Sequence, residues 1–309
     1  MEPIPKRLPV TDSGLEIRGR LVIERIATIA STNTELLERA VLFPPGVPVD
    51  SAAVWLVAAS QTAGRGRRGR RWLGSPGVSL TASLGLDIAL PSDPGALALV
   101  AGLAVAETLA GLGVAVRLKW PNDVYLRAGD GSLTKVGGIL CETRRLINGP
   151  PASAPDTDGG GLNSGHYQRE RASTSTAPWR LVIGCGLNLF PSDDSASLAL
   201  TNPPAGYLFE QPDAQTRARL ELALGAALLE AVRQATEVGP GPALARWQKF
   251  DLLAGCEVTV HTPSGSYQAL AEGVDQHGRL LVADAALPQT RRALLSEEVT
   301  VRWSRTTRD

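Results

Sequence analysis

Short apolar runs divide much of the chain into predicted strands. The run VWLVAA at 54–59 predicts a buried strand, and the alternating stretch at 78–84 predicts another strand soon after it. Apolar and polar residues also alternate at 114–119, and strand-like segments follow at 135–142 and 180–190. We therefore expect a β-sheet in the larger, N-terminal part of the protein.

Helical patterns lie between and after these strands. A helix is expected to start within 31–38, because Thr32 and Glu35 have the spacing of a capping box, in which two side chains satisfy unpaired backbone N–H groups. A longer helix is expected over about 214–236, where apolar residues recur at near-helical spacing: Leu220, Leu224, Leu228 and Val232. The chain therefore combines helices with strands.

The most apolar segment, 95–113, is nearly long enough to span a bilayer. Glu107 interrupts it, about half of it is alanine and glycine, and a Ser-Asp-Pro start precedes it, so we expect a buried helix. The first ten residues hold no apolar run of signal-peptide length, which argues against secretion. No membrane partner is expected.

Composition changes along the chain and suggests its domains. The segment 148–178 is rich in Gly, Pro, Ser and Thr and poor in bulky apolar residues, so we expect a disordered insertion between two strands. From Cys256 onward, short strand-like segments alternate with turns, which predicts a small β domain over 251–305. The rest of the chain is then a lead at 1–20 and a main domain at 21–250.

Charge and cysteine content restrict the class of protein. Lys plus Arg and Asp plus Glu both total 31, so no overall charge favours DNA or an anionic membrane. The three cysteines, Cys141, Cys185 and Cys256, lack metal-ligand spacing and lie in apolar runs, which favours reduced thiols in a cytoplasmic protein. No zinc site is expected.

One loop departs from this neutral background. Residues 60–72 read SQTAGRGRRGRRW, with five arginines between two predicted strands. The glycines have the spacing of a dinucleotide-binding loop, but a strand rather than a helix follows them, and no Gly-Lys-Ser/Thr of a P-loop follows either. The interpretation that remains is an ordered cradle for a phosphate-bearing anion, with a solvated Arg-Gly segment for RNA as the alternative.

Histidine is scarce, which limits the chemistry that this loop can support. The chain has three, His166 in the insertion and His261 and His277 in the β-rich tail, so no histidine base is expected near the arginines. Chemistry would then come from positioning and positive charge, which suits reactions at phosphorus.

Several motifs in a fixed order connect the loop with a known family. They are STN at 31–33, GRGRRGR at 64–70, KWPNDV at 119–124, KVGGILCE at 135–142 and GCGLNL at 184–189. In this order they resemble the biotin protein ligases, which attach biotin to the carrier domain of biotin-dependent carboxylases. The resemblance runs from about Ser31 to Trp303. It implies an α+β fold, in which a mixed β-sheet of the biotin/lipoate ligase type carries helices and is followed by a small SH3-like β-barrel.

The resemblance also implies a two-step activity and its ligands. Family members make biotinyl-5′-AMP from biotin and ATP with Mg²⁺, and then transfer the biotin to a lysine of a biotin carboxyl carrier protein. The positions implied for the ring of biotin are Ser31, Thr32, Asn33 and Gln61. The positions implied for its carboxylate and for phosphate are Gly64, Arg65, Gly66 and Arg67.

Further residues receive roles by the same resemblance. Lys119 would face the reacting carboxylate and α-phosphate, and Lys135 would point to the carbonyl region of biotin, so these two act with Arg65 and Arg67 as the implied catalytic residues. Contacts near the nucleotide are implied for Trp120, Asn122 and Asp123, of which Asp123 is the implied Mg²⁺ ligand. Ligand-facing positions on two strands are implied for Gly137, Gly138, Gly184, Gly186 and Asn188.

The sequence departs from the regulatory form of this family and leaves alternatives open. About thirty residues precede Ser31, too few for the winged helix-turn-helix of DNA-binding members, so a non-regulatory ligase without a DNA partner is expected. The aromatic residue that stacks on adenine is hard to place, and Phe190, Tyr207 and Phe209 are candidates. A lipoate ligase, which shares the fold, and a nucleic-acid binder stay open, as does a homodimer.

Overall fold

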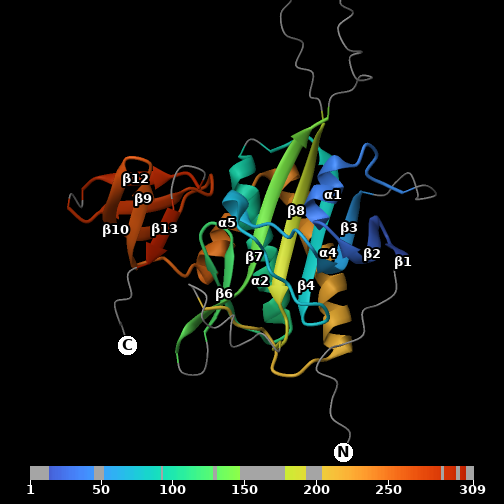
Figure 1. Cartoon of the computed structure of the whole chain (residues 1–309). Helices are drawn as coiled ribbons and strands as arrows, with labels where there is room; N and C mark the ends of the chain where they lie inside the picture. Colours follow the sequence, from blue (N-terminus) through green and yellow to red (C-terminus); the bar gives the residue numbers. More distant parts are fainter. Residues whose placement is uncertain are drawn as a thin grey trace, which may run out of the picture.

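An eight-stranded mixed sheet forms the centre of the larger part of the protein (Figure 1). The computed structural model describes residues 14–44, 52–91, 93–127, 131–146, 178–192, 204–286, 289–296 and 300–303. The strands lie in the order β1-β2-β3-β4-β8-β7-β6-β5, with β2 parallel to β3 and the other neighbours antiparallel. Their bounds are β1 Gly14–Arg18, β2 Leu21–Ile29, β3 Ala53–Gln61, β4 Ser79–Ile88, β5 Val116–Lys119, β6 Asp123–Arg127, β7 Leu133–Arg145 and β8 Trp179–Asn188.

Helices cover both faces of this sheet, which confirms the expected α+β fold (Figure 1). The short helix α1 (Thr32–Glu38) packs on one face, against β3, β4, β7 and β8. The other face carries α2 (Leu97–Gly111), α4 (Ala214–Val238) and α5 (Gly241–Trp247). Within the described residues, single 3-10 turns lie at η1 (Arg67–Gly69), η2 (Pro94–Ala96) and η3 (Gln248–Phe250).

The apolar helix α2 lies at the centre of the main core. Within the part of the chain that the structure describes, the stretch Pro94–Gly111 is the one helix with the length and composition of a membrane span, yet 61% of it is buried inside the protein. At its polar side, Glu107 pairs with Arg246 of α5 at 2.9 Å. The predicted buried helix is confirmed, and so is the predicted α4, whose leucine row faces the same core.

The start of α1 differs from the prediction by one residue. Ser31, not Thr32, caps the helix: its backbone is extended and its hydroxyl accepts a hydrogen bond from the Thr34 N–H at 3.4 Å. Glu35 pairs with Arg39 at 3.0 Å instead of reaching back to the cap. The capping-box prediction was therefore wrong, because tertiary contacts draw the Thr32 hydroxyl to Ser83 on β4, at 2.6 Å.

Some elements were not apparent from the sequence pattern. β1 and β6 have five residues each, and such short strands depend on the neighbours that they pair with. β1 lies within 1–20, the range expected to be a lead, and pairs antiparallel with β2. β2, α5 and the C-terminal strand β12 were also missed.

A five-stranded antiparallel sheet stands where a small β-barrel was expected. Its order is β12-β11-β10-β9-β13, and its strands are β9 Glu257–Thr262, β10 Gly265–Val274, β11 Leu280–Asp284, β12 Arg291–Leu294 and β13 Thr300–Trp303. The turn between β10 and β11 contacts the main domain, where Trp120 Nε1 donates to the Gly278 carbonyl at 3.0 Å and His277 Nδ1 lies 2.9 Å from Asp93. These bonds fix the small sheet beside the end of β5.

The insertion predicted at 148–178 lies outside the described residues, apart from Pro178. β7 and β8 pair as far as Arg145 and Trp179, and the Leu146 N–H donates to the Pro178 carbonyl at 2.9 Å. The two ends of the insertion therefore meet at the end of one hairpin.

Candidate active site

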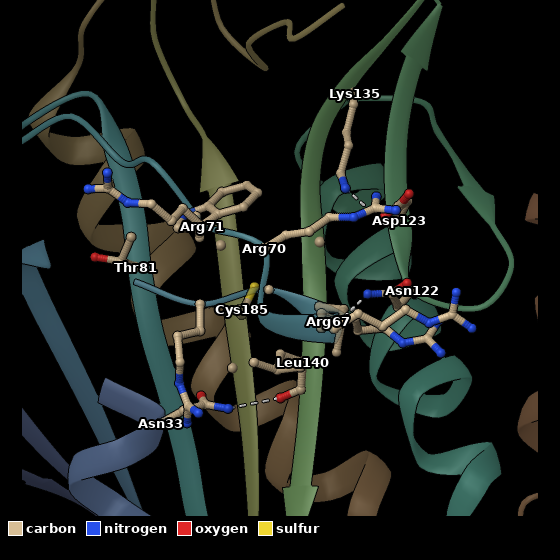
Figure 2. Close-up of a pocket in the computed structure, with 18 of the residues that line it drawn as sticks. Asn33, Arg67, Arg70, Arg71, Thr81, Asn122, Asp123, Lys135, Leu140 and Cys185 are labelled. Atoms are coloured by element: carbon tan, nitrogen blue, oxygen red, sulfur yellow. Dashed lines mark hydrogen bonds and ion pairs between the residues drawn. The ribbon is translucent and has the colours of Figure 1, made fainter. Parts of the chain in front are cut away.

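A pocket lies on the sheet face that carries α1. Its walls are the start of α1, the arginine loop between β3 and β4, and the turn between β5 and β6. Figure 2 shows Asn33 and Leu140 at one end of the pocket and Lys135 and Asp123 at the other. The two ends differ in chemistry, and the sheet between them forms the floor.

Three neighbouring strands supply this floor. Residues in register form two rows across β4, β8 and β7: Thr81, Gly186 and Gly138, then Ser83, Gly184 and Leu140. A Cβ added to Gly184 would overlap the amide of Asn33, and one added to Gly186 would lie 2.5 Å from the Trp72 ring. The two glycines therefore let α1 and the arginine loop approach the sheet.

The end beneath α1 is polar and uncharged. The Thr32 N–H donates to Gln61 Oε1 at 2.7 Å, and the Ser83 hydroxyl donates to Asn33 Oδ1 at 2.6 Å. Asn33 Nδ2 in turn donates to the Leu140 carbonyl at 3.2 Å, the bond drawn in Figure 2. These side chains are held in fixed orientations, because each of the buried polar groups has partners in the protein.

The arginine loop is closed by its own backbone. The Gly66 N–H donates to the Arg70 carbonyl at 2.7 Å, and the Trp72 N–H donates to the Gly64 carbonyl at 2.9 Å. Arg68 takes a left-handed conformation with φ of 56°, which turns the chain back over the pocket. The loop is therefore ordered and flanked by strands, as its position in the sequence predicted.

The arginines of the loop have different partners. Arg65 Nη2 lies 3.3 Å from Glu142 Oε1 on β7. Arg67 Nη2 donates to the Ser296 carbonyl of the small domain at 2.5 Å. All five arginines line the pocket, and Figure 2 shows Arg70 extending toward Asp123.

The far end of the pocket is cationic. Lys119 ends β5 and lies opposite Asp123, the first residue of β6, in the register of the two strands. Lys135 Nζ forms an ion pair with Asp123, 2.6 Å from Oδ1. Lys119 Nζ donates to the Val301 carbonyl of the small domain at 3.1 Å. Burial lowers the pKa of Lys119; Asp123 opposes this change, and the positive charge of Lys135 adds to it.

A β-bulge turns Lys135 toward this end. The pairing of β6 with β7 skips Val136, which is fully buried in the main core. Strict alternation from Gly138 would have put Val136 on the pocket face and Lys135 in the core. The extra residue exchanges the faces on which these two side chains lie, so that Val136 is in the core and Lys135 lines the pocket.

Known proteins with similar sequences identify the family. Residues 48–151 match the Biotin/lipoate A/B protein ligase family. The chain is 31% identical over 261 residues to the Bifunctional ligase/repressor BirA of Escherichia coli. This match covers 83% of this chain and 68% of that protein. It is 29% identical over 270 residues to the Biotin--[acetyl-CoA-carboxylase] ligase of Paracoccus denitrificans, covering 84% of this chain and 94% of that one.

The chain belongs to the biotin protein ligase family. A solved structure agrees on the fold: the biotin protein ligase of Aquifex aeolicus, in complex with biotin and ATP, has a TM-score of 0.64 and 23% identity over 91% of this chain and 99% of that one.

Most residues predicted for the site of this ligase lie in one pocket. The predicted residues that line it are Ser31, Thr32, Asn33, Gln61, Arg65, Gly66, Arg67, Lys119, Trp120, Asn122, Asp123, Lys135, Gly138, Gly184 and Gly186. Trp120 is 2% exposed and bonded to the small domain, so it also anchors the two domains. Asn122 Nδ2 donates to the Ile139 carbonyl at 2.7 Å, which ties the turn after β5 to β7.

Other predicted residues of the ligase do not line the pocket. The Gly64 carbonyl closes the arginine loop, and a Cβ at Gly137 would overlap Leu187 on the core side of the sheet. Asn188 Nδ2 donates to the Gly206 carbonyl at 3.0 Å. Their positions suit them to supporting the loop and the floor of the pocket.

The aromatic candidates for adenine stacking also lie elsewhere. Phe190 is 3% exposed and packs on Phe209, with ring centroids 5.9 Å apart. The Tyr207 hydroxyl lies 3.5 Å from Glu210. None of the three lines the described pocket.

Sequence reasoning missed several pocket residues of the ligase. Trp72, Thr81, Leu140, Cys185 and Val301 line it without having been assigned. Thr81 and Leu140 were accessible to prediction, because they alternate with core residues on predicted strands next to assigned motifs. No local signal marks Val301, which reaches the pocket through the docking of the small domain.

Proposed function

We propose that this protein activates biotin with ATP to form biotinyl-5′-AMP and then transfers the biotin to a lysine of a carboxylase carrier domain. The two steps would use one pocket. The observation that carries the proposal is the change in chemistry along the pocket, from a polar uncharged end to a cationic end over a floor that contains glycine.

The polar end suits the ring of biotin. The ureido group of biotin carries N–H donors and a carbonyl acceptor, and Ser31, Thr32, Asn33 and Gln61 offer fixed polar groups at this end of the pocket. Lipoate has a dithiolane ring without such groups, so it cannot form the hydrogen bonds that a ureido ring can form here, each worth about 0.5–1.5 kcal/mol. The pocket therefore favours biotin over lipoate.

The cationic end suits the reacting groups. The biotin carboxylate is an anion and must approach the α-phosphate of ATP, which is also negative. Lys119, Lys135 and the arginines reduce this repulsion and stabilise the charge that develops on the phosphoryl oxygens. The carboxylate oxygen forms a bond to the α-phosphorus, and the bond to the β-phosphate oxygen breaks, which releases pyrophosphate.

The second step needs a free amine. The carrier lysine attacks the acyl carbon of the adenylate, and AMP leaves with the electrons of the acyl–oxygen bond. Among the described residues the pocket is lined by one carboxylate, Asp123, and by no histidine. Because Asp123 is paired with Lys135, we expect the cationic surroundings to favour the neutral form of the incoming amine.

The site fits one magnesium ion bound together with substrate. Mg²⁺ is usually held by one or two carboxylates plus phosphate oxygens, and it neutralises phosphate charge. The described residues contain no group of three or more His, Cys, Asp or Glu side chains that could hold a metal. Asp123 would therefore supply the protein ligand, and ATP the others.

The names of related proteins suggest the protein substrate that receives the biotin. The relative from Paracoccus denitrificans described above is a biotin--[acetyl-CoA-carboxylase] ligase. We therefore propose a biotin carrier domain of acetyl-CoA carboxylase, or of a related carboxylase, as the protein substrate.

The proposal is tested by ATP–pyrophosphate exchange. Labelled pyrophosphate should enter ATP when biotin is supplied, and at least tenfold more slowly with the same concentration of lipoate. Labelled biotin should then appear on a purified carrier domain but not on its lysine-to-arginine variant. Exchange that prefers lipoate would refute the assignment of the substrate.

A further inference from the structure

Glu142 joins two parts of the pocket without lining it. It lies on β7, two residues beyond Leu140, and its side chain is 27% exposed. Its carboxylate accepts a hydrogen bond from Asn33 Nδ2 at 2.8 Å and pairs with Arg65 Nη2 at 3.3 Å. Asn33 belongs to the polar end of the pocket and Arg65 to the arginine loop. One carboxylate therefore contacts both.

The contact with Asn33 fixes the orientation of its side-chain amide. The Ser83 hydroxyl donates to Asn33 Oδ1 at 2.6 Å, and its oxygen also lies 2.6 Å from the Thr32 hydroxyl, which donates to Gln61 Oε1 at 3.0 Å. The amide of Asn33 then has its nitrogen toward Glu142. An anionic acceptor is the strongest partner for that nitrogen, so Glu142 sets the orientation of the Asn33 amide.

The position of Glu142 in the sheet places it beside the pocket and outside its lining. It pairs with Val182 on β8, one row past Gly184 and Leu140, and Val182 is fully buried in the cluster beneath α1. Glu142 thus acts through Asn33 and Arg65, which both line the pocket.

We propose that Glu142 is a positioning residue, which orients Asn33 for the ring of biotin and holds Arg65 at the mouth of the same pocket. The inference rests on the proposed function, since it assigns the two contacts to biotin binding and to retention of the adenylate. The arginine loop is linked through Glu142 to the ring-binding end, so a ring that orders Asn33 also steadies the loop.

Two substitutions separate the contacts. Glu142→Ala removes both, so biotin affinity should fall about tenfold, equivalent to about 1.4 kcal/mol. Glu142→Gln keeps an acceptor for Asn33 but removes the charge that pairs with Arg65. It should change biotin affinity by less than about threefold while releasing biotinyl-AMP several-fold faster.

The measurements are titration calorimetry with biotin, dissociation of biotinyl-AMP after rapid filtration, and thermal unfolding. Glu107→Ala and Glu107→Gln are matched controls, because Glu107 also pairs with one arginine, on the other face of the sheet and away from the pocket. Both controls should match wild type in biotin affinity and adenylate release. In the background of Arg65→Met, adding Glu142→Gln should not increase adenylate release further.

The outcomes distinguish the two hypotheses. A wild-type protein that does not bind biotin would refute the proposed function, and this inference with it. If wild type binds biotin and Glu142→Ala binds it equally well, the proposed function stands and the positioning role is wrong. A purely structural role would lower the thermal midpoint of both Glu142 variants without separating biotin affinity from adenylate release.

Discussion

Lys119 offers the sharpest test of how the pocket works. In Lys119→Gln the ammonium is lost while the length of the side chain is roughly kept. The first step should depend on this charge, because two anions approach each other and charge builds on the phosphoryl oxygens. The second step starts from an acyl group whose charge is already neutralised, so it should depend on Lys119 much less.

The expected magnitude follows from the surroundings of Lys119. It lies in a partly buried site, where a unit charge about 4 Å away contributes about 4 kcal/mol at an effective dielectric constant of about 20. Part of that interaction already acts on bound ATP, so we expect a loss of about 3 kcal/mol in the transition state, within the range for one electrostatic stabiliser. Adenylate formation should then slow by about 100- to 1,000-fold.

Folding stability should change little in the same variant. The pKa of Lys119 is lowered mainly by burial, which means that the folded protein disfavours the charged form. Removing the charge therefore relieves a cost, and this offsets the loss of the bond to the Val301 carbonyl, worth about 1 kcal/mol. An inactive but stable variant is the expected result.

Single-turnover kinetics can separate the two steps. Adenylate formation is measured from biotin and labelled ATP, and transfer is measured from supplied biotinyl-AMP to the carrier domain. Lys249→Gln is the control, because its side chain is exposed in η3. If both steps of Lys119→Gln fall equally in a well-folded protein, the assignment of Lys119 to the first step is wrong.

Three further predictions concern the loop, the insertion and one cysteine. Arg67→Ala should release biotinyl-AMP at least tenfold faster in a filtration assay, since one charge-assisted contact is worth about 1.5–3 kcal/mol. Unchanged retention of biotinyl-AMP would exclude Arg67 from the phosphate site. Replacing 149–176 by a Gly-Asn turn should leave thermal stability and carrier biotinylation nearly intact, because Leu146 and Pro178 already meet at the end of the β7–β8 hairpin. Loss of biotinylation in a folded variant would reveal that the segment helps to dock the carrier. Burial raises the pKa of Cys185 to about 12, and only 2% of this residue is exposed although it borders the pocket. The thiol should therefore stay protonated at pH 8 and react with iodoacetamide only after unfolding, and peptide mass spectrometry that finds Cys185 labelled in the native protein would contradict this.

The sequence by itself determined the longer local elements and the order of the motifs. The apolar run of α2 was sufficient because a helix buried on nearly all sides is apolar all round. The leucine spacing of α4 was sufficient because a helix that buries one face must repeat apolar residues at its own period. The arginine loop was recognised as strand-flanked for a similar reason, since the apolar residues on both sides of it are near neighbours in the chain.

The tertiary structure decided how the motifs combine into a site. Lys135 faces the pocket because of a bulge at Val136, which depends on pairing between β6 and β7 and has no signature in a run of residues. Lys119 meets Val301 across 182 positions of sequence, and Arg67 reaches Ser296 in the same small domain. Such contacts form only when separate elements pack, and their free energy depends on burial and distance, neither of which the order of residues specifies.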